Sequence, residues 1–119
     1  MKYDWIESYC LSKKGVSKDY KEEWDAHRYL LGDKMIAMDG HNNHGLHIFT
    51  MKLDISLGSS LRAEYEDISP GYYMNKDHWN SLNLDGSVPD NIVRMMIDNT
   101  YKSIFESLSK KVQKEILEG

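Results

Sequence analysis

Cysteine, proline and long apolar runs are scarce in this sequence. Cys10 stands alone and there are only two prolines and eight glycines, which excludes an internal disulfide and a flexible linker. The longest strictly apolar run, residues 35–38, is far too short to cross a bilayer. Asp4 and Glu7 lie where a signal peptide would need apolar residues. We therefore expect a soluble, cytoplasmic protein without a membrane partner, and a monomer is favoured.

Charge is spread evenly, with a small acidic excess. The 119 residues carry 15 Lys and Arg against 19 Asp and Glu, a formal charge of -4, and both halves share the bias. This balance argues against a basic nucleic-acid-binding tail but leaves room for a small basic patch. Hydrophobic residues make up 40% of the chain, enough for one core. We expect a single domain over residues 1–119.

Hydrophobic spacing predicts helices at both ends of the chain and strands between them. Apolar residues have helical spacing over residues 2–12 and about 89–108. Between residues 16 and 53 they alternate instead, and Gly32-Asp33 is typical of a tight turn between two strands. The order of elements predicts an α+β fold, an antiparallel sheet with helices packed on one face and the other face partly open.

Shorter elements are expected in the middle of the chain. Asp54 or Ser56 can cap a short helix, and residues 79–84 have the composition of a further strand. A run of turn-forming residues over 39–45 is expected to follow the second strand of the meander. Ser109 opens a charged terminal segment.

The helix over residues 89–108 has the clearest pattern in the chain. Pro89 suits its first turn, and one side carries a continuous apolar stripe that should face the sheet. Another face has Arg94, Asp98 and Lys102 at four-residue steps, so these three charges are expected to pair along the helix.

Catalytic fingerprints are absent. The sequence has no GxSxG, no phosphate-binding loop, no Rossmann glycine pattern and no CxxC. Cys10 belongs to the apolar stripe of the first helix, which favours a small core residue over a nucleophile. We therefore expect a protein that is not an enzyme and needs no cofactor.

Histidines gather in one part of the sequence. His41, His44 and His47 follow at three-residue intervals, and His27 could lie on a neighbouring strand. Imidazoles are good ligands for zinc, copper or nickel. However, His41 and His44 lie among Asn and Gly in turn sequence, and no carboxylate or thiol completes a ligand spacing. We expect no metal site.

Residues 70–79 read PGYYMNKDHW and combine aromatic rings, one Lys and an amide. Aromatic faces beside a cation suit base stacking and phosphate contact. The same residues equally suit a loop that Trp79 pins to the sheet, with Asn75 and His78 satisfying turn backbone. Composition favours this second, structural role, because one lysine is a small electrostatic footprint.

Several segments, in order, resemble the YjbR/MmcQ family. GDKMIA at 32–37 is similar to its "gKmFa" hairpin, MKLD at 51–54 to its "lKcdp" strand end, PGYYMNKDHW at 70–79 to its "PGyhmNKkHW" signature, and LDGSVPD at 84–90 to its "ldg.vpd" turn. Tyr73 and Asp77 stand where the family has His and often Lys, so this signature carries less positive charge.

The resemblance implies a CyaY-like α+β architecture, likened to the "double-wing" DNA-binding domain. It implies a non-enzymatic module that binds double-stranded DNA through the open sheet face and the loop over residues 72–79. On this reading Lys34, Lys52 and Lys76 meet phosphates, Tyr72 and Asn75 approach bases or sugar, and His78 and Trp79 anchor the loop.

A second reading is a small-molecule or partner-protein binding domain. Its pocket would lie between the long helix and the sheet, near Met74, Met95 and Met96, which adapt to varied apolar ligands. Salt-dependent binding would favour DNA, and a saturable apolar ligand would favour the pocket.

Overall fold

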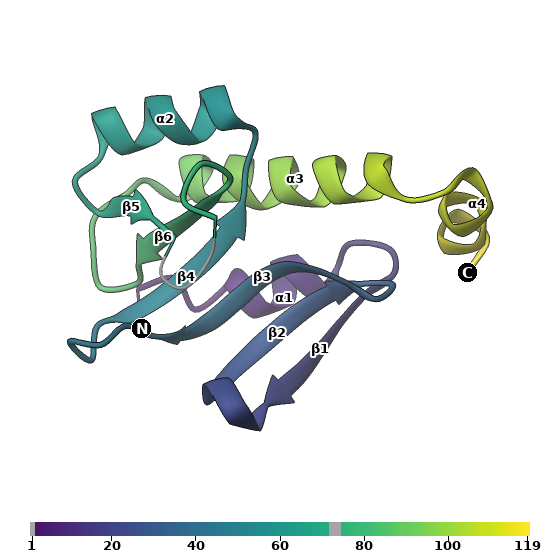
Figure 1. The fold of residues 1–119 in the computed structure, drawn as a ribbon, viewed down its shortest axis with the longest axis horizontal. Coiled ribbons are helices and arrows are strands. Elements are labelled where there is room, and N and C mark those ends of the chain that lie inside the picture. Colours follow the sequence, from purple (N-terminus) through teal and green to yellow (C-terminus); the bar gives the residue numbers. More distant parts are fainter. Residues whose placement is uncertain (1, 72–74) are drawn as a thin grey trace.

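The computed structural model describes residues 2–71 and 75–119 (Figure 1). Within them, one antiparallel sheet has the strand order β1-β2-β3-β4-β6-β5. The strands are β1 (Val16–Lys21), β2 (Ala26–Leu31), β3 (Lys34–His41), β4 (His47–Lys52), β5 (Ile68–Pro70) and β6 (Trp79–Asn83). The helices are α1 (Ile6–Leu11), α2 (Ile55–Glu64), α3 (Asp90–Ser107) and α4 (Lys110–Glu118), with a 3-10 turn η1 (Glu22–Trp24). The predicted α+β class is confirmed.

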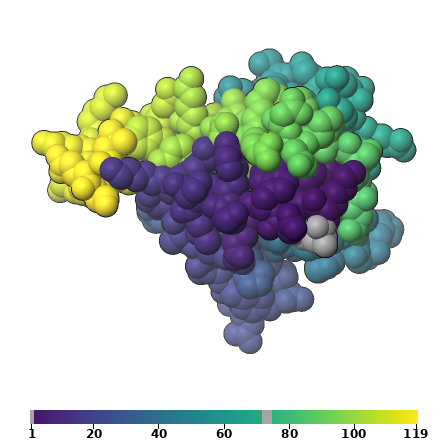
Figure 2. All heavy atoms as spheres, turned by 180° about the vertical axis from the view of Figure 1, so that it is seen from behind, coloured from purple at the N-terminus to yellow at the C-terminus, as the bar shows by residue number. Residues whose placement is uncertain are grey.

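The helices pack on one face of the sheet. Helix α3 contacts β2, β3 and β4, while α1 contacts β1 and α2 contacts β5. Figure 2 shows this face, where the purple N-terminal residues and the green of α3 lie side by side. The strands lie in front in Figure 1, which views the opposite, open face.

Alternation along β4 separates the core from the open face. Phe49 and Met51 are fully buried in the core cluster beneath the helices. Thr50, between them, points to the open face and pairs with Ser81 of β6, and their hydroxyl oxygens lie 2.9 Å apart. By register Met38 and Ile48 lie on this same face, and all four side chains are buried, so the central strands present little exposed surface there.

Helix α3 supplies much of the core, as its stripe predicts. Pro89 lies just before the helix, and Met96 and Ile97 have no exposed surface. Thr100 is also fully buried, and its hydroxyl donates to the carbonyl of Ile36 in β3 at 2.8 Å, which satisfies this buried polar group. The Met96 and Ile97 side chains belong to the core cluster that packs against the sheet.

The ends of several elements differ from the sequence-based expectation. Helix α1 begins at Ile6 rather than at residue 2, because the preceding residues form a turn whose Tyr3 is buried and donates to the carbonyl of Val88 at 2.7 Å. Strand β3 continues to His41, so the turn occupies residues 42–46 only. The three-residue strand β5 and the turn η1 were not predicted.

The expected ion pairs along α3 are replaced by contacts to α1 and the turn after it. The Asp98 carboxylate accepts the Tyr9 hydroxyl at 2.7 Å and pairs with Lys13 at 2.6 Å. The Arg94 guanidinium lies over the Trp5 ring, 4.6 Å from its centroid. Pairing within one helix is worth only about 0.2–0.5 kcal/mol, so contacts between elements outweigh it.

Cys10 is completely buried in the core, as its place in the apolar stripe predicts. Burial raises the pKa of its thiol to about 12, with Lys13 opposing the shift. The helices of the described residues fall short of the length and apolarity needed to cross a membrane.

Candidate nucleic-acid interface

Residues 75–79, here called the NKDHW turn, lead into β6. The side-chain oxygen of Asn75 accepts the N–H of Asp77 at 2.9 Å, and the Asn75 carbonyl accepts the N–H of Trp79 at 2.9 Å. This is the local hydrogen bonding that favours Asn in turns. The amide oxygen of Asn75 is therefore used inside the turn, and its amide nitrogen is the atom left to face a ligand.

The loop before this turn closes on the backbone of Trp79. Gly71 donates its N–H to the carbonyl of Trp79 at 2.7 Å. The Lys76 ammonium reaches back to the carbonyl of Gly71 at 3.2 Å. The Trp79 side chain is half-buried. Both ends of the loop thus meet at one residue, and Lys76 lies at its base.

The NKDHW turn also binds the end of β4. Leu53 donates its N–H to the carbonyl of His78 at 2.8 Å, and Lys52 is the register partner of Trp79. Lys52 therefore lies beside the turn that carries Lys76. An open depression of about 700 Å³ adjoins this end of the sheet and is lined by Lys52, Leu53, Asp54, Ile55, Ser56, Ser59, His78 and Ser103.

Charge at this end of the sheet is close to balanced, because Asp77 follows Lys76 in the NKDHW turn and Asp54 lies beside Lys52. Among the ion pairs between described residues, none includes Lys34, Lys52 or Lys76. Asp54 is the carboxylate in the depression, and hydrogen bonds from Asn99 and Ser103 lower its pKa. The Asp54 carboxylate is therefore ionised at neutral pH and offsets one of the lysines.

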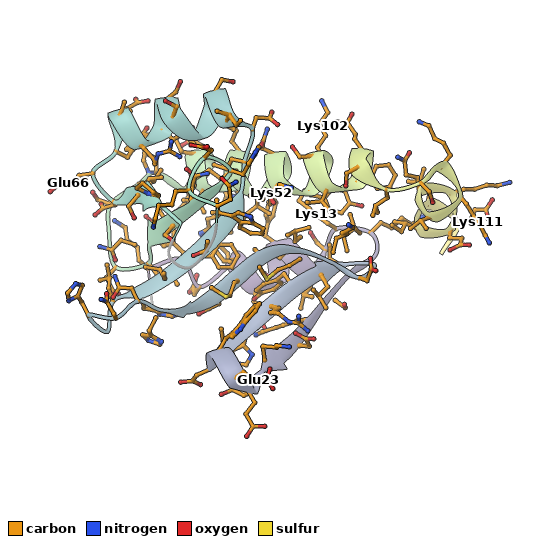
Figure 3. The ribbon with its side chains drawn as sticks, in the orientation of Figure 1. Lys13, Glu23, Lys52, Glu66, Lys102 and Lys111 are labelled. Atoms are coloured by element: carbon orange, nitrogen blue, oxygen red, sulfur yellow. The ribbon has the colours of Figure 1, made fainter. Side chains whose placement is uncertain are left out.

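The structure gathers some of the predicted site residues and leaves others apart. Lys52, Asn75 and Lys76 lie together where β4 ends and β6 begins, whereas Lys34 begins β3 at the β2–β3 hairpin, paired with Leu31. Tyr72 lies outside the described residues. In Figure 3 Lys52 lies near the middle of the molecule, far from Lys111 on α4.

Sequence reasoning missed the serines of the depression. Ser56 and Ser59 lie on α2 and Ser103 on α3, and they meet Lys52 and His78 only because both helices pass the end of β4. Their spacing in the sequence carries no signal, because Ser103 lies 44 residues after Ser59 and on a different helix.

The predicted histidine group is divided between two strands and a turn. His41 and His47 stack across β3 and β4 with ring centroids 4.8 Å apart, and the His47 Nε2 lies 2.5 Å from a carboxylate oxygen of Asp39. His44 is exposed in the turn, and its N–H donates to Asn42. Within residues 2–71 and 75–119, no three His, Cys, Asp or Glu side chains are arranged to hold a metal ion.

Comparison with known proteins agrees with the sequence signature. The family model YjbR matches residues 11–103. The chain is similar to the uncharacterized protein YjbR of Escherichia coli K12, 27% identical over 112 residues that cover 92% of each chain. It is also similar to the uncharacterized protein YyaQ of Bacillus subtilis, 30% identical over 66 residues that cover 56% of this chain and 53% of that one.

Solved structures share the fold. The crystal structure of Deinococcus radiodurans protein DR2400, with a DUF419 domain, has a TM-score of 0.80 at 23% identity, covering 93% of this chain and 84% of that one. The crystal structure of a Pseudomonas syringae protein has a TM-score of 0.73 at 22% identity, covering 87% and 98%. Identities this low bear on the fold alone.

Proposed function

Since this chain belongs to the YjbR family, we propose that it is a non-enzymatic binding module whose ligand is double-stranded DNA. The observation that carries the proposal is the contact between the NKDHW turn and β4. Through the hydrogen bond from Leu53 to His78, it places Lys52 and Lys76 at one end of the sheet, beside the half-buried ring of Trp79. An open sheet face flanked by hairpins is the surface that a CyaY-like, double-wing domain would offer.

The residues divide into two roles. Lys34, Lys52 and Lys76 contact phosphates, because an ammonium without a carboxylate partner can exchange its counterion for a phosphate at little cost. Asn75 approaches a base or sugar with its amide nitrogen, since its oxygen is held by Asp77. Tyr72 is proposed as a base or sugar contact only because of its position in the sequence signature.

The small number of cations sets the strength of binding. Three phosphate contacts give a slope of about -3 for the logarithm of the association constant against the logarithm of salt concentration. The net charge of -4 opposes binding through the rest of the surface. Binding is therefore weak and steeply salt-dependent.

Fluorescence anisotropy with a labelled 20-base-pair duplex tests the proposal. Lys52→Ala and Lys76→Ala should each weaken binding by about 1 kcal/mol at low salt, for every duplex sequence, and reduce the magnitude of the salt slope by about 1. Lys111→Ala makes the same change in charge on α4, far from Lys52 (Figure 3), and should leave the slope unchanged.

Two results would remove the DNA proposal. One is no binding of any duplex at high micromolar protein and low salt. The other is an equal loss for Lys111→Ala and Lys76→Ala, which would indicate diffuse electrostatic attraction rather than a site. Tighter binding of a single strand than of the duplex would indicate that this surface binds single-stranded nucleic acid instead.

A further inference from the structure

A second cavity lies on the opposite face of the sheet, beneath α1. It has a volume of about 220 Å³ and is lined by Asp4, Ile6, Glu7, Lys18, Tyr29, Asp39, Phe49 and Leu84. The lining residues come from α1 and the turn before it, from β1, β2, β3 and β4, and from the residue after β6. The space is open to solvent on the side of Asp4, Glu7 and Lys18, which are exposed, and its other walls come from packed strands, so it is pre-formed, as small-molecule sites usually are.

The hydroxyl of a largely buried tyrosine faces this cavity. Tyr29 is only 2% exposed, yet its hydroxyl makes no hydrogen bond to another described residue, and the side chain lines the cavity wall. Burial, together with Cys10, Glu7 and Asp39, raises the pKa of Tyr29, so the hydroxyl is neutral at physiological pH. Among the described residues the buried side-chain polar atom without a partner is the indole nitrogen of Trp5, so the Tyr29 hydroxyl oxygen reaches the open space of the cavity, where a ligand can hydrogen-bond to it.

The charges around the cavity favour a cation. Three carboxylates, of Asp4, Glu7 and Asp39, line it against the Lys18 ammonium. Lys18 is paired with Glu7, and one Asp39 oxygen contacts His47, which leaves Asp4 and the other Asp39 oxygen for a ligand. The Tyr29 and Phe49 rings meet edge to face 5.7 Å apart and make one wall apolar.

We propose that this cavity binds a small organic cation, a primary alkylammonium. Its N–H groups donate to the Asp39 carboxylate and the Tyr29 hydroxyl, and its alkyl chain packs against Phe49. The ion pair gives the charge a partner out of water, and the aromatic wall adds a cation–π attraction. The cavity volume lies below the usual range for drug-sized ligands, so the cation has only a few non-hydrogen atoms.

Two other ligand classes fit less well. A metal ion needs several ligands converging on one point, and the described residues contain no such group of three. An anion would meet Asp4, Glu7 and Asp39, and the single ammonium of Lys18 is held by Glu7. The site is separate from the proposed DNA surface, because Lys52 lies on the far side of the sheet from Phe49 by strand alternation.

Titration calorimetry of the full chain with n-butylammonium chloride tests the proposal. We expect saturable binding with a dissociation constant on the order of 1 mM or below, given the few atoms of the ligand. n-Butanol, the neutral analogue, and ammonium chloride at matched ionic strength should give no saturable heat. Amide chemical-shift changes should centre on residues 4–7, Tyr29 and Asp39.

Variants identify the groups that receive the cation. Asp39→Asn should weaken binding about 10-fold or more, and Tyr29→Phe, which keeps the ring, about fivefold. Asp33→Asn removes the same charge from the exposed β2–β3 turn and should bind like the wild type. Because Asp39 also contacts His47, a thermal melt checks that the variant is folded, and Tyr29→Phe tests the site independently of that contact.

The proposal is overturned if n-butanol binds as well as n-butylammonium, or if no saturable binding occurs. It is equally overturned if folded Asp39→Asn and Tyr29→Phe bind like Asp33→Asn, or if the shift changes lie elsewhere on the molecule. None of these outcomes bears on the DNA titration, which uses other residues.

Discussion

Gly71 and Trp79 approach each other more closely than any side chain at position 71 would allow. A Cβ on Gly71 would lie 2.6 Å from the Cβ of Trp79 and 2.9 Å from its carbonyl oxygen. The N–H of Gly71 donates to that same carbonyl at 2.7 Å. This contact closes the loop that precedes β6 and thereby fixes where the NKDHW turn lies against β4.

We predict that Gly71→Ala destabilises the protein by about 1–3 kcal/mol, because the backbone must move apart to admit a methyl group. Chemical denaturation measures the loss. Ser69→Ala, an exposed neighbour on β5, is the matched control and should change stability by less than about 0.5 kcal/mol. A Gly71→Ala variant as stable as the wild type would show that the loop can shift freely.

A second prediction concerns the core under α3. Ile97 has no exposed surface, so Ile97→Asp places a carboxylate in an apolar environment and should cost several kcal/mol or prevent folding. Met95 on the same helix is 39% exposed, and Met95→Asp should have a much smaller effect. Equal melting temperatures for the two variants would contradict the packing of α3 against the sheet.

Local patterns in the sequence predict most of the fold. The stripe of α3, the Gly32-Asp33 hairpin and the alternation of β4 each depend on residues a few positions apart. The contacts that join the elements depend instead on residues that are far apart in the sequence. Tyr3 binds Val88 across 85 residues, and Tyr9 binds Asp98 across 89. The sequence therefore indicated pairing along α3, whereas the folded chain pairs Asp98 with α1 and Lys13.

The two candidate sites also differ in how far the sequence alone predicts them. The NKDHW turn is contiguous, so its hydrogen-bonding residues are recognisable in the sequence, and Lys52 joins it through strand pairing. The cavity beneath α1 draws on six separate parts of the chain, and neither Tyr29 nor Asp39 has a distinctive neighbour. Only the assembled sheet and α1 place these two side chains around one space.

A third prediction is that removal of metal ions leaves stability unchanged. His41 and His47 stack on each other, and the Nε2 of His47 is already bound to Asp39. EDTA should therefore not alter the melting temperature, and His41→Ala should change stability by less than about 0.5 kcal/mol, since the side chain is exposed. A drop of several degrees in EDTA that zinc restores would identify a metal site among these histidines.

The last prediction uses the buried thiol of Cys10. Burial raises the pKa of this thiol from 9.0 to about 12, because the thiolate would lose its hydration in the core. Between pH 9 and 12 the unfolded chain therefore releases a proton that the folded chain keeps. The stability contributed by the neutral thiol is complete below pH 9 and is lost as the pH rises toward 12.

Urea denaturation between pH 8 and 11 should show this loss. Other buried groups such as Tyr3 also have a raised pKa, so the informative quantity is the difference between the wild type and Cys10→Ala, which has no thiol to ionise. Cys10→Ala is expected to be less stable at pH 8, because it leaves a small cavity, but to lose less stability with rising pH. Ellman's reagent should label Cys10 slowly in the native protein and rapidly in urea. Parallel pH profiles for the two proteins, or rapid native labelling, would mean that the thiol is accessible to water and that α1 does not bury it against the sheet.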